Sequence, residues 1–217
     1  MITLHESVPV KNALVPLGLA DHVGVARDQL LDAAHLTPDA VADPGNRLPA
    51  AAWLELWHRL VAISGDTLAG MRAGGMLEWG HFGVVDFILS TSPNLRQALG
   101  HFVRYVRILR ADLSLTLRQE PGYLVLERAH PDDMNSPAHR QIAEFGTCGI
   151  ARRIPRVTGV HWRPARVELR DAPLSSCADY ESLAGCEVSF RAARYSVWIP
   201  DHVLDVPMAQ GDDGLHR

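Results

Sequence analysis

The sequence predicts an α+β protein in which a helical N-terminal half packs on a C-terminal half of order β-β-α-β-α-β-β. Three observations support this fold class. Apolar residues recur every three or four positions through the first half, which is the period of an amphipathic helix. From Leu113 the period becomes two, as in a half-buried strand. Turn signals then divide the second half into short strands and helices, an order that favours an antiparallel or mixed sheet.

The first half begins with two helical regions. Residues 15–31 carry two short apolar stretches, which predict one broken helix or two short ones. Residues 35–47 are rich in Pro, Asp and Gly and predict a loop. Pro49 then opens a strong helix that Gly65 ends, because proline suits a first helical turn and glycine suits the position after the last one. The apolar face of this helix comprises Trp53, Leu56, Trp57, Leu60 and Val61.

The glycine-rich segment 70–83 is predicted to be a flexible connection. A phosphate-binding loop is excluded because the lysine and the preceding strand are missing. A short apolar helix follows up to Ser90. Ser92 and Pro93 then signal the start of another helix, with Ser92 as its N-cap. That helix carries a continuous apolar stripe of Leu95, Ala98, Leu99, Phe102, Val106 and Leu109.

The second half contains the strands. Leu113, Leu115 and Leu117 alternate with polar residues, and Pro121–Gly122 predicts a hairpin to residues 123–128. A helix follows from Ser136 to near Pro155, then strands and one helix at 166–170, 177–184, 187–190 and 196–199. We expect residues 1–217 to form a single domain, with a helical subdomain over 1–111 and an α+β subdomain over 112–217.

Composition and charge narrow the class of protein. The chain has 217 residues, 47% of them hydrophobic, and a net charge of −4, with no apolar run long enough for a membrane span. A module that holds nucleic acid normally shows a basic excess, so these residues are not expected to bind DNA themselves. Cys148, Cys177 and Cys186 show no C-x-x-C spacing, and the N-terminus lacks the features of a signal peptide. We therefore expect reduced thiols and a cytoplasmic location, with a Cys177–Cys186 disulfide as the alternative.

Catalytic and metal motifs are missing from the sequence. It contains no nucleophile elbow, no H-E-x-x-H, no phosphate loop and no dinucleotide-binding turn, so we expect no enzymatic activity. The eleven histidines are scattered without metal-ligand spacing, so we expect neither metal nor cofactor. Among them His81 stands out for its place beside Trp79 and Phe82. Arginines at helical spacing form either a solvated face or an anion-facing edge: Arg104, Arg107 and Arg110.

Several segments carry a resemblance to a known family. Residues 80–99 read GHFGVVDFILSTSPNLRQAL and are followed by a helix rich in arginine and aromatic residues. Further pieces lie on both sides of this segment, at 42–49, 141–145, 162–167, 180–190 and 195–200. Together they resemble the N-terminal effector-binding ("arabinose-binding") domain of AraC-type bacterial transcription regulators. The family label names a sugar, but members of this branch respond to varied effectors.

The resemblance implies a sensor that binds a small effector and controls DNA binding. The DNA-binding part would be a C-terminal domain with helix-turn-helix motifs, which we expect to be absent from residues 1–217. DNA would be reached only through that domain, and the sequence leaves open a homodimer. An alternative from a different class is a haem or gas sensor with His101 as ligand; an enzyme is a more remote one.

The effector site is expected between the helical half and the sheet. The apolar stripe of residues 95–109 must pack on something, and the first strand follows it directly. The predicted ligand-binding residues are aromatic, with few polar groups among them: Trp79, His81, Phe82, Phe102, Tyr105, Arg107, Phe145 and Trp198. Such a lining favours a mainly apolar or amphipathic metabolite over a free sugar, which would need more amides and carboxylates. The alternative is that these aromatic side chains close a solid core.

Overall fold

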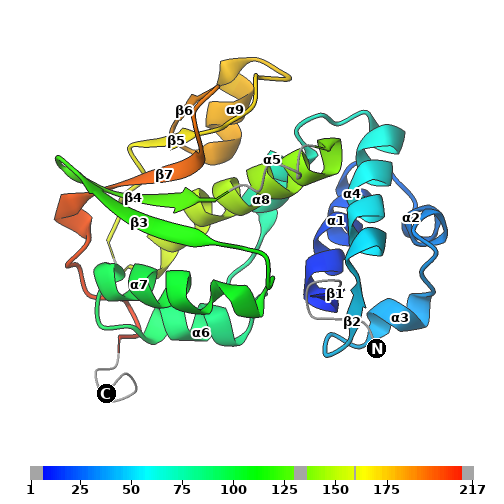
Figure 1. The fold of residues 1–217 in the computed structure, drawn as a ribbon, viewed down its shortest axis with the longest axis horizontal. Coiled ribbons are helices and arrows are strands. Elements are labelled where there is room, and N and C mark those ends of the chain that lie inside the picture. Colours follow the sequence, from blue (N-terminus) through cyan, green and yellow to red (C-terminus); the bar gives the residue numbers. More distant parts are fainter. Residues whose placement is uncertain (1–6, 130–135, 159, 212–217) are drawn as a thin grey trace.

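The computed structural model describes residues 7–129, 136–158 and 160–211. Helices fill its N-terminal half, and a mixed five-stranded sheet with further helices fills the C-terminal half (Figure 1). The predicted α+β class is therefore confirmed. No helix in the described ranges is long and apolar enough to cross a membrane.

The N-terminal group consists of α1 (Val10–His22), α2 (Arg27–Ala33), α3 (Pro38–Ala42) and α4 (Ala50–Ser64), with β1 (Ser7–Pro9) paired antiparallel to β2 (Arg47–Pro49). Two short helices replace a single broken one, as one of the two alternatives predicted. The loop predicted over residues 35–47 is wrong where α3 forms. Thr37 caps this helix by accepting a hydrogen bond from the Ala40 N–H at 3.3 Å. One turn is too short to show a helical period.

Helix α5 (Ala69–Met76) corrects the prediction of a flexible connection over residues 70–83. Its glycines permit close packing on α8 (Pro137–Arg153). A Cβ atom on Gly74 would lie only 2.7 Å from both the Phe145 carbonyl oxygen and the Gly149 nitrogen, and one on Gly70 would overlap the Gln141 carbonyl. The two glycines are four residues apart and so lie on one helix face. Only residues 77–83 remain as a connection.

Two helices follow, α6 (Val84–Thr91) and α7 (Leu95–Tyr105). The predicted N-cap of α7 is wrong by two residues. The Asn94 side chain accepts the hydrogen bond from the Gln97 N–H at 2.9 Å, whereas the Ser92 hydroxyl donates to the Ile88 carbonyl at 2.7 Å at the end of α6. Both residue types are good caps, and the sequence signal did not separate them.

The sheet contains β3 (Leu115–Glu120), β4 (Tyr123–Arg128), β5 (Arg166–Glu168), β6 (Glu187–Ser189) and β7 (Tyr195–Pro200) in the order β3-β4-β7-β5-β6. Among the strand pairs of the described residues, β5–β6 alone is parallel, and α9 (Cys177–Ala184) makes the crossover that a parallel pair requires. The predicted hairpin and the helix closed by Gly185 are confirmed. Short 3-10 turns lie at Val106–Ile108, Ile154–Val157 and Asp201–Val203. The three cysteines are free thiols.

Buried apolar side chains form two clusters. The N-terminal core lies among α1 to α4, and the sheet core lies among α6, α7, α9 and the five-stranded sheet. Helices α5 and α8 contribute to both, and α8 runs from the sheet to the N-terminal helices (Figure 1). Helix α8 therefore joins the two cores. The expected subdomain boundary at residue 111 stays a prediction, although α6 and α7 share their core with the sheet.

Candidate functional site

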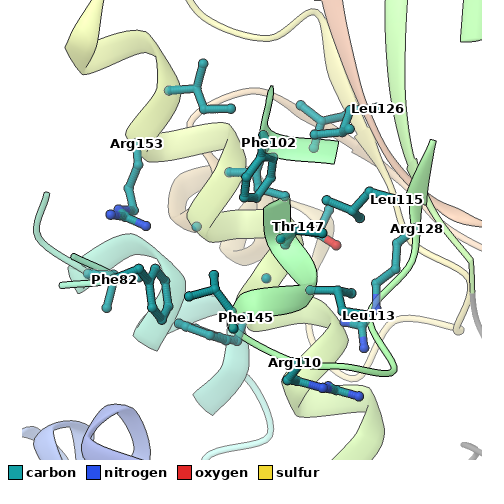
Figure 2. A pocket seen from close by; sticks show the side chains of 18 of the residues that line it. Phe82, Phe102, Arg110, Leu113, Leu115, Leu126, Arg128, Phe145, Thr147 and Arg153 are labelled. Atoms are coloured by element: carbon teal, nitrogen blue, oxygen red, sulfur yellow. The ribbon is translucent and has the colours of Figure 1, made fainter. Parts of the chain in front are cut away.

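A cavity of about 100 Å³ lies where the two cores meet (Figure 2). Helix α8 forms one wall and the faces of β3, β4 and β7 form another. Helices α6 and α7 and the connection 77–83 close the sides, while α1 and α4 reach the cavity through Asn12 and Trp53. The lining is mainly apolar and includes Phe82, Phe102, Leu115, Leu126, Phe145 and Val197.

The helical wall follows from the period of α8. Ile142, Phe145, Gly149 and Arg153 recur at three- and four-residue spacing, so they lie on one face of the helix, and all four line the cavity. Phe145 also tilts against Trp57 of the N-terminal core, with ring centroids 5.8 Å apart. One aromatic side chain thus contacts both the cavity and the N-terminal core.

The sheet wall follows from the period of the strands. On β4, Leu126 and Arg128 are two residues apart and share a face. The register places Arg128 opposite Leu115 of β3 and Tyr195 of β7. All four residues line the cavity, so this end of the wall combines apolar side chains with a guanidinium and a phenol.

A buried ion pair organises the connection 77–83. The Asp86 carboxylate accepts hydrogen bonds from the Gly80 and Phe82 N–H groups at 2.8 and 3.0 Å and from the Arg153 guanidinium at 2.6 Å. The same guanidinium lies over the rings of Trp79 and Phe82, 5.0 and 5.3 Å from their centroids. Burial lowers the pKa of Arg153, while Asp86 opposes that shift. Asp86 therefore balances the charge of Arg153 and also holds in place the backbone that carries the two aromatic residues.

A second set of contacts ties the N-terminal core to the cavity. The Asn12 amide donates to the Leu109 carbonyl at 2.9 Å, and the Trp53 indole N–H donates to the Asn12 carbonyl at 3.1 Å. Arg110 pairs with Asp112 and lies 5.0 Å from the centroid of the Trp53 ring. Movement of either core would have to break these contacts, because they bridge α1, α4 and the segment that leads into β3.

Four of the eight predicted site residues line the cavity: Trp79, Phe82, Phe102 and Phe145. The other four lie outside it. His81 donates from Nε2 to the Lys11 carbonyl at 2.8 Å, and burial lowers its pKa. Arg107 is exposed and donates to the Ala111 carbonyl at 3.0 Å. Tyr105 lies beneath the Arg104 guanidinium and beside the His101 ring.

Trp198 occupies the opposite face of β7 from the cavity-lining Val197, as the alternation of a strand requires. Its ring stacks beneath the Arg166 guanidinium, 3.7 Å from the centroid. His101, the ligand of the alternative haem hypothesis, is hydrogen-bonded to the Ser92 hydroxyl at 3.0 Å and does not line the cavity. Within the described ranges, no three His, Cys, Asp or Glu side chains are grouped to hold a metal ion.

Three arginines of the cavity were not among the predicted site residues: Arg110, Arg128 and Arg153. A signal existed for Arg128, because it follows Leu124 and Leu126 on the apolar face of a predicted strand. A signal also existed for Arg110, the third member of an arginine series at helical spacing. Its companions Arg104 and Arg107 are exposed, so only the last member faces inward.

Fold and site together define a domain with a small, largely apolar cavity that has charged groups in its wall. This is how proteins commonly build sites for small organic molecules. Residues 24–208 match the family described as the arabinose-binding domain of AraC transcription regulators, N-terminal. The match covers most of the chain, and the chain belongs to this family. The resemblance inferred from the sequence is thereby confirmed, and with it the class of effector-sensing domains of transcription regulators.

One curated protein is similar to this chain in sequence and one solved structure is similar to it in fold. The chain is 25% identical over 208 residues to the ornithine utilization regulator of Pseudomonas aeruginosa, a match that covers 94% of this chain and 60% of that protein. It is similar in fold to the crystal structure of the transcriptional regulator CdpR from Pseudomonas aeruginosa, with a TM-score of 0.60 and 17% identity over 87% of this chain and 57% of that one. The chain thus spans about 60% of the length of these regulators.

Proposed function

We propose that residues 1–217 act as the sensor of a longer regulator, in which a small effector occupies the cavity between the two cores and controls a C-terminal DNA-binding part. The observation that carries this proposal is the place of the cavity. It is lined from the N-terminal core, the sheet and the helix that joins them, so an occupant contacts every part of the joint. The domain itself performs no catalysis and acts in the cytoplasm.

An effector can control the regulator only if it favours one of two arrangements of the two cores. A ligand shifts such an equilibrium only by its difference in affinity for the two states, and typical couplings are about 1–3 kcal/mol. The two arrangements can differ in the bridging contacts of Asn12, Trp53 and Arg110, which are made in one and broken in the other. An effector that fills the cavity stabilises the arrangement in which these contacts are closed.

The lining favours a mainly apolar or amphipathic effector. A sugar needs many hydrogen-bonding groups, whereas most of this lining is aliphatic or aromatic. Ornithine, mentioned in the name of one relative, carries a cationic side chain that calls for a free carboxylate. Asp86, the acidic residue that lines this cavity, is already held by Arg153. We therefore do not extend ornithine to this chain.

A thermal-shift screen of fatty acids, aromatic acids, amino acids and sugars tests the proposal when it is combined with a blocked cavity. Leu126→Phe adds volume inside the cavity. Leu117→Phe is a matched control, because Leu117 pairs with Leu126 on the neighbouring strand and does not line the cavity. We expect the compounds that raise the Tm of the wild type to act equally on Leu117→Phe and not on Leu126→Phe.

The proposal fails if no class of compound raises the Tm, or if the blocked variant responds as the wild type does. It also fails if the full-length regulator binds DNA identically with and without every ligand that binds this chain. In that case the cavity would bind small molecules without sensing them.

A further inference from the structure

The arginines in the cavity wall differ in whether a carboxylate balances their charge. Of the three arginines that line the cavity, Arg153 is paired with Asp86 at 2.6 Å and Arg110 is paired with Asp112. Arg128 differs from both. Within the described residues, no carboxylate oxygen comes within 4.0 Å of its guanidinium, and its hydrogen bond goes to the Ile142 carbonyl at 3.3 Å. A guanidinium has five N–H donors, so most of its capacity is left for another acceptor.

The position of Arg128 directs this capacity into the cavity. Leu124, Leu126 and Arg128 alternate along β4, and the first two belong to the sheet core. The guanidinium lies across Gly146 of α8, where a Cβ atom would be 3.8 Å from Nη1, an ordinary contact. Figure 2 shows the Arg128 and Arg110 side chains converging at one end of the cavity, beside Leu113, with Arg153 and Phe82 at the other.

A half-buried cation that has no carboxylate partner among the described residues is costly. Burial, and after it the charge of Arg110, lowers the pKa of Arg128 to about 10, so the side chain is charged at neutral pH. Removing a charge from water without a partner costs several kcal/mol, on the order expected for buried ions. A sequence that needed only to fill this strand position would use another leucine. The position is therefore better explained by an anion that enters from outside the chain.

We propose that the effector of this domain is a monocarboxylic acid whose carboxylate pairs with Arg128 and whose apolar body lies between Phe102, Leu126 and Phe145. The inference rests on the proposed function and names the chemical class of its ligand. Arginine suits this role because its fork matches the two oxygens of a carboxylate. One negative charge suffices, since Asp86 and Asp112 already balance the other two arginines.

The volume of the cavity limits the size of the acid. Cavities of about 150 Å³ lined by Leu, Ile and Phe accept benzene. At about 100 Å³ this cavity suits a short-chain acid, and an aromatic acid would require some expansion.

The test uses butyrate, hexanoate and benzoate, each compared with its primary amide, by isothermal titration calorimetry. The amide keeps the shape and removes the charge. We expect the wild type to bind at least one acid about 10- to 100-fold more tightly than its amide, since hydrogen bonds between charged groups have this strength. Arg128→Met should lose that preference, and Arg128→Lys should keep part of it. Arg104→Met, an exposed arginine of α7, should behave as the wild type.

Folding of the variants is checked independently. Removing a half-buried charge that has no carboxylate partner in the described part of the chain should leave the Tm of Arg128→Met equal to or above that of the wild type. If Arg128→Met does not fold, Arg128→Lys carries the test. The inference is overturned if the ratio of acid affinity to amide affinity is the same in Arg128→Lys as in the wild type.

Other outcomes separate this inference from the proposed function. If acids bind Arg128→Met as tightly as the wild type but do not bind Leu126→Phe, the carboxylate assignment is wrong and the sensor cavity stands. If neither acids nor amides bind while amino acids or sugars from the screen do, the assignment is again wrong and the sensor cavity stands. If nothing in the screen binds, both are wrong.

Discussion

The contact between α5 and α8 gives a prediction whose size can be worked out from the structure. A Cβ atom on Gly74 would lie 2.7 Å from the Phe145 carbonyl oxygen and the Gly149 nitrogen, both of them backbone atoms of α8. Ordinary contact begins near 3.4 Å, so Gly74→Ala must separate the helices by roughly 0.7 Å. Overpacking of this kind costs about 1–3 kcal/mol, against a gain of at most about 1 kcal/mol in helix propensity. We expect a net loss of stability.

The adjacent Gly75 is a matched control on the same helix. A Cβ atom there meets only the Leu183 carbonyl oxygen, at 3.7 Å, so Gly75→Ala keeps the propensity gain without the clash. We expect Gly75→Ala to raise the free energy of unfolding by about 0.5–1 kcal/mol and Gly74→Ala to lower it. Urea denaturation followed by circular dichroism measures both. Shifts of the same sign and similar size would refute the view that these glycines serve helix contact.

Three further predictions concern the cavity, a buried carboxyl group and DNA. Trp79→Ala and Phe102→Ala remove parts of the cavity wall, so each should lose the ligand-induced rise in Tm while keeping a native circular dichroism spectrum; if both merely unfold, these side chains serve only the core. Burial raises the pKa of Glu144 to about 7, from 4.5 when unfolded, so its protonation stabilises the fold below about pH 4.5 and that contribution is lost as the pH rises to about 7. The loss amounts to up to about 3 kcal/mol of the free energy of unfolding, and Glu144→Gln should reduce the difference between the values measured at pH 5 and at pH 7.5. If the variant shows the same dependence of stability on pH as the wild type, the raised pKa of Glu144 is contradicted. The net charge of −4 predicts that residues 1–217 will not retard a promoter duplex in a gel, and a salt-sensitive, sequence-selective shift would contradict this.

The sequence predicted the elements that carry their own boundary signals. Pro49 and Gly65 enclose α4, and Gly65 adopts the left-handed φ of 69° that favours glycine. Gly185 closes α9 in the same way, with φ of 76°. Helix α5 was missed because the role of Gly70 and Gly74 depends on α8, which lies about seventy residues further along the chain. Glycine is a poor helix former unless a neighbour requires its small size, and local sequence does not show that neighbour.

The site was predicted in part for similar reasons. The apolar stripe of α7 brings Phe102 to the cavity, and the spacing on α8 brings Phe145. Trp198 lies on the opposite face of its strand, because alternation fixes which residues share a face but not which face meets the helices. The alternation of the sequence alone already places Arg128 on the same face of β4 as Leu124 and Leu126. That it lacks a carboxylate partner among the described residues depends on long-range packing, which only the structure provides.

A crystal structure of the domain with the tightest-binding compound of the screen tests the central claim most directly. The account predicts that the compound lies in the cavity between β3, β4 and α8, in contact with Phe102, Leu126 and Phe145. A compound bound elsewhere, for example on the Trp198 face of the sheet, with the cavity unoccupied, would contradict it.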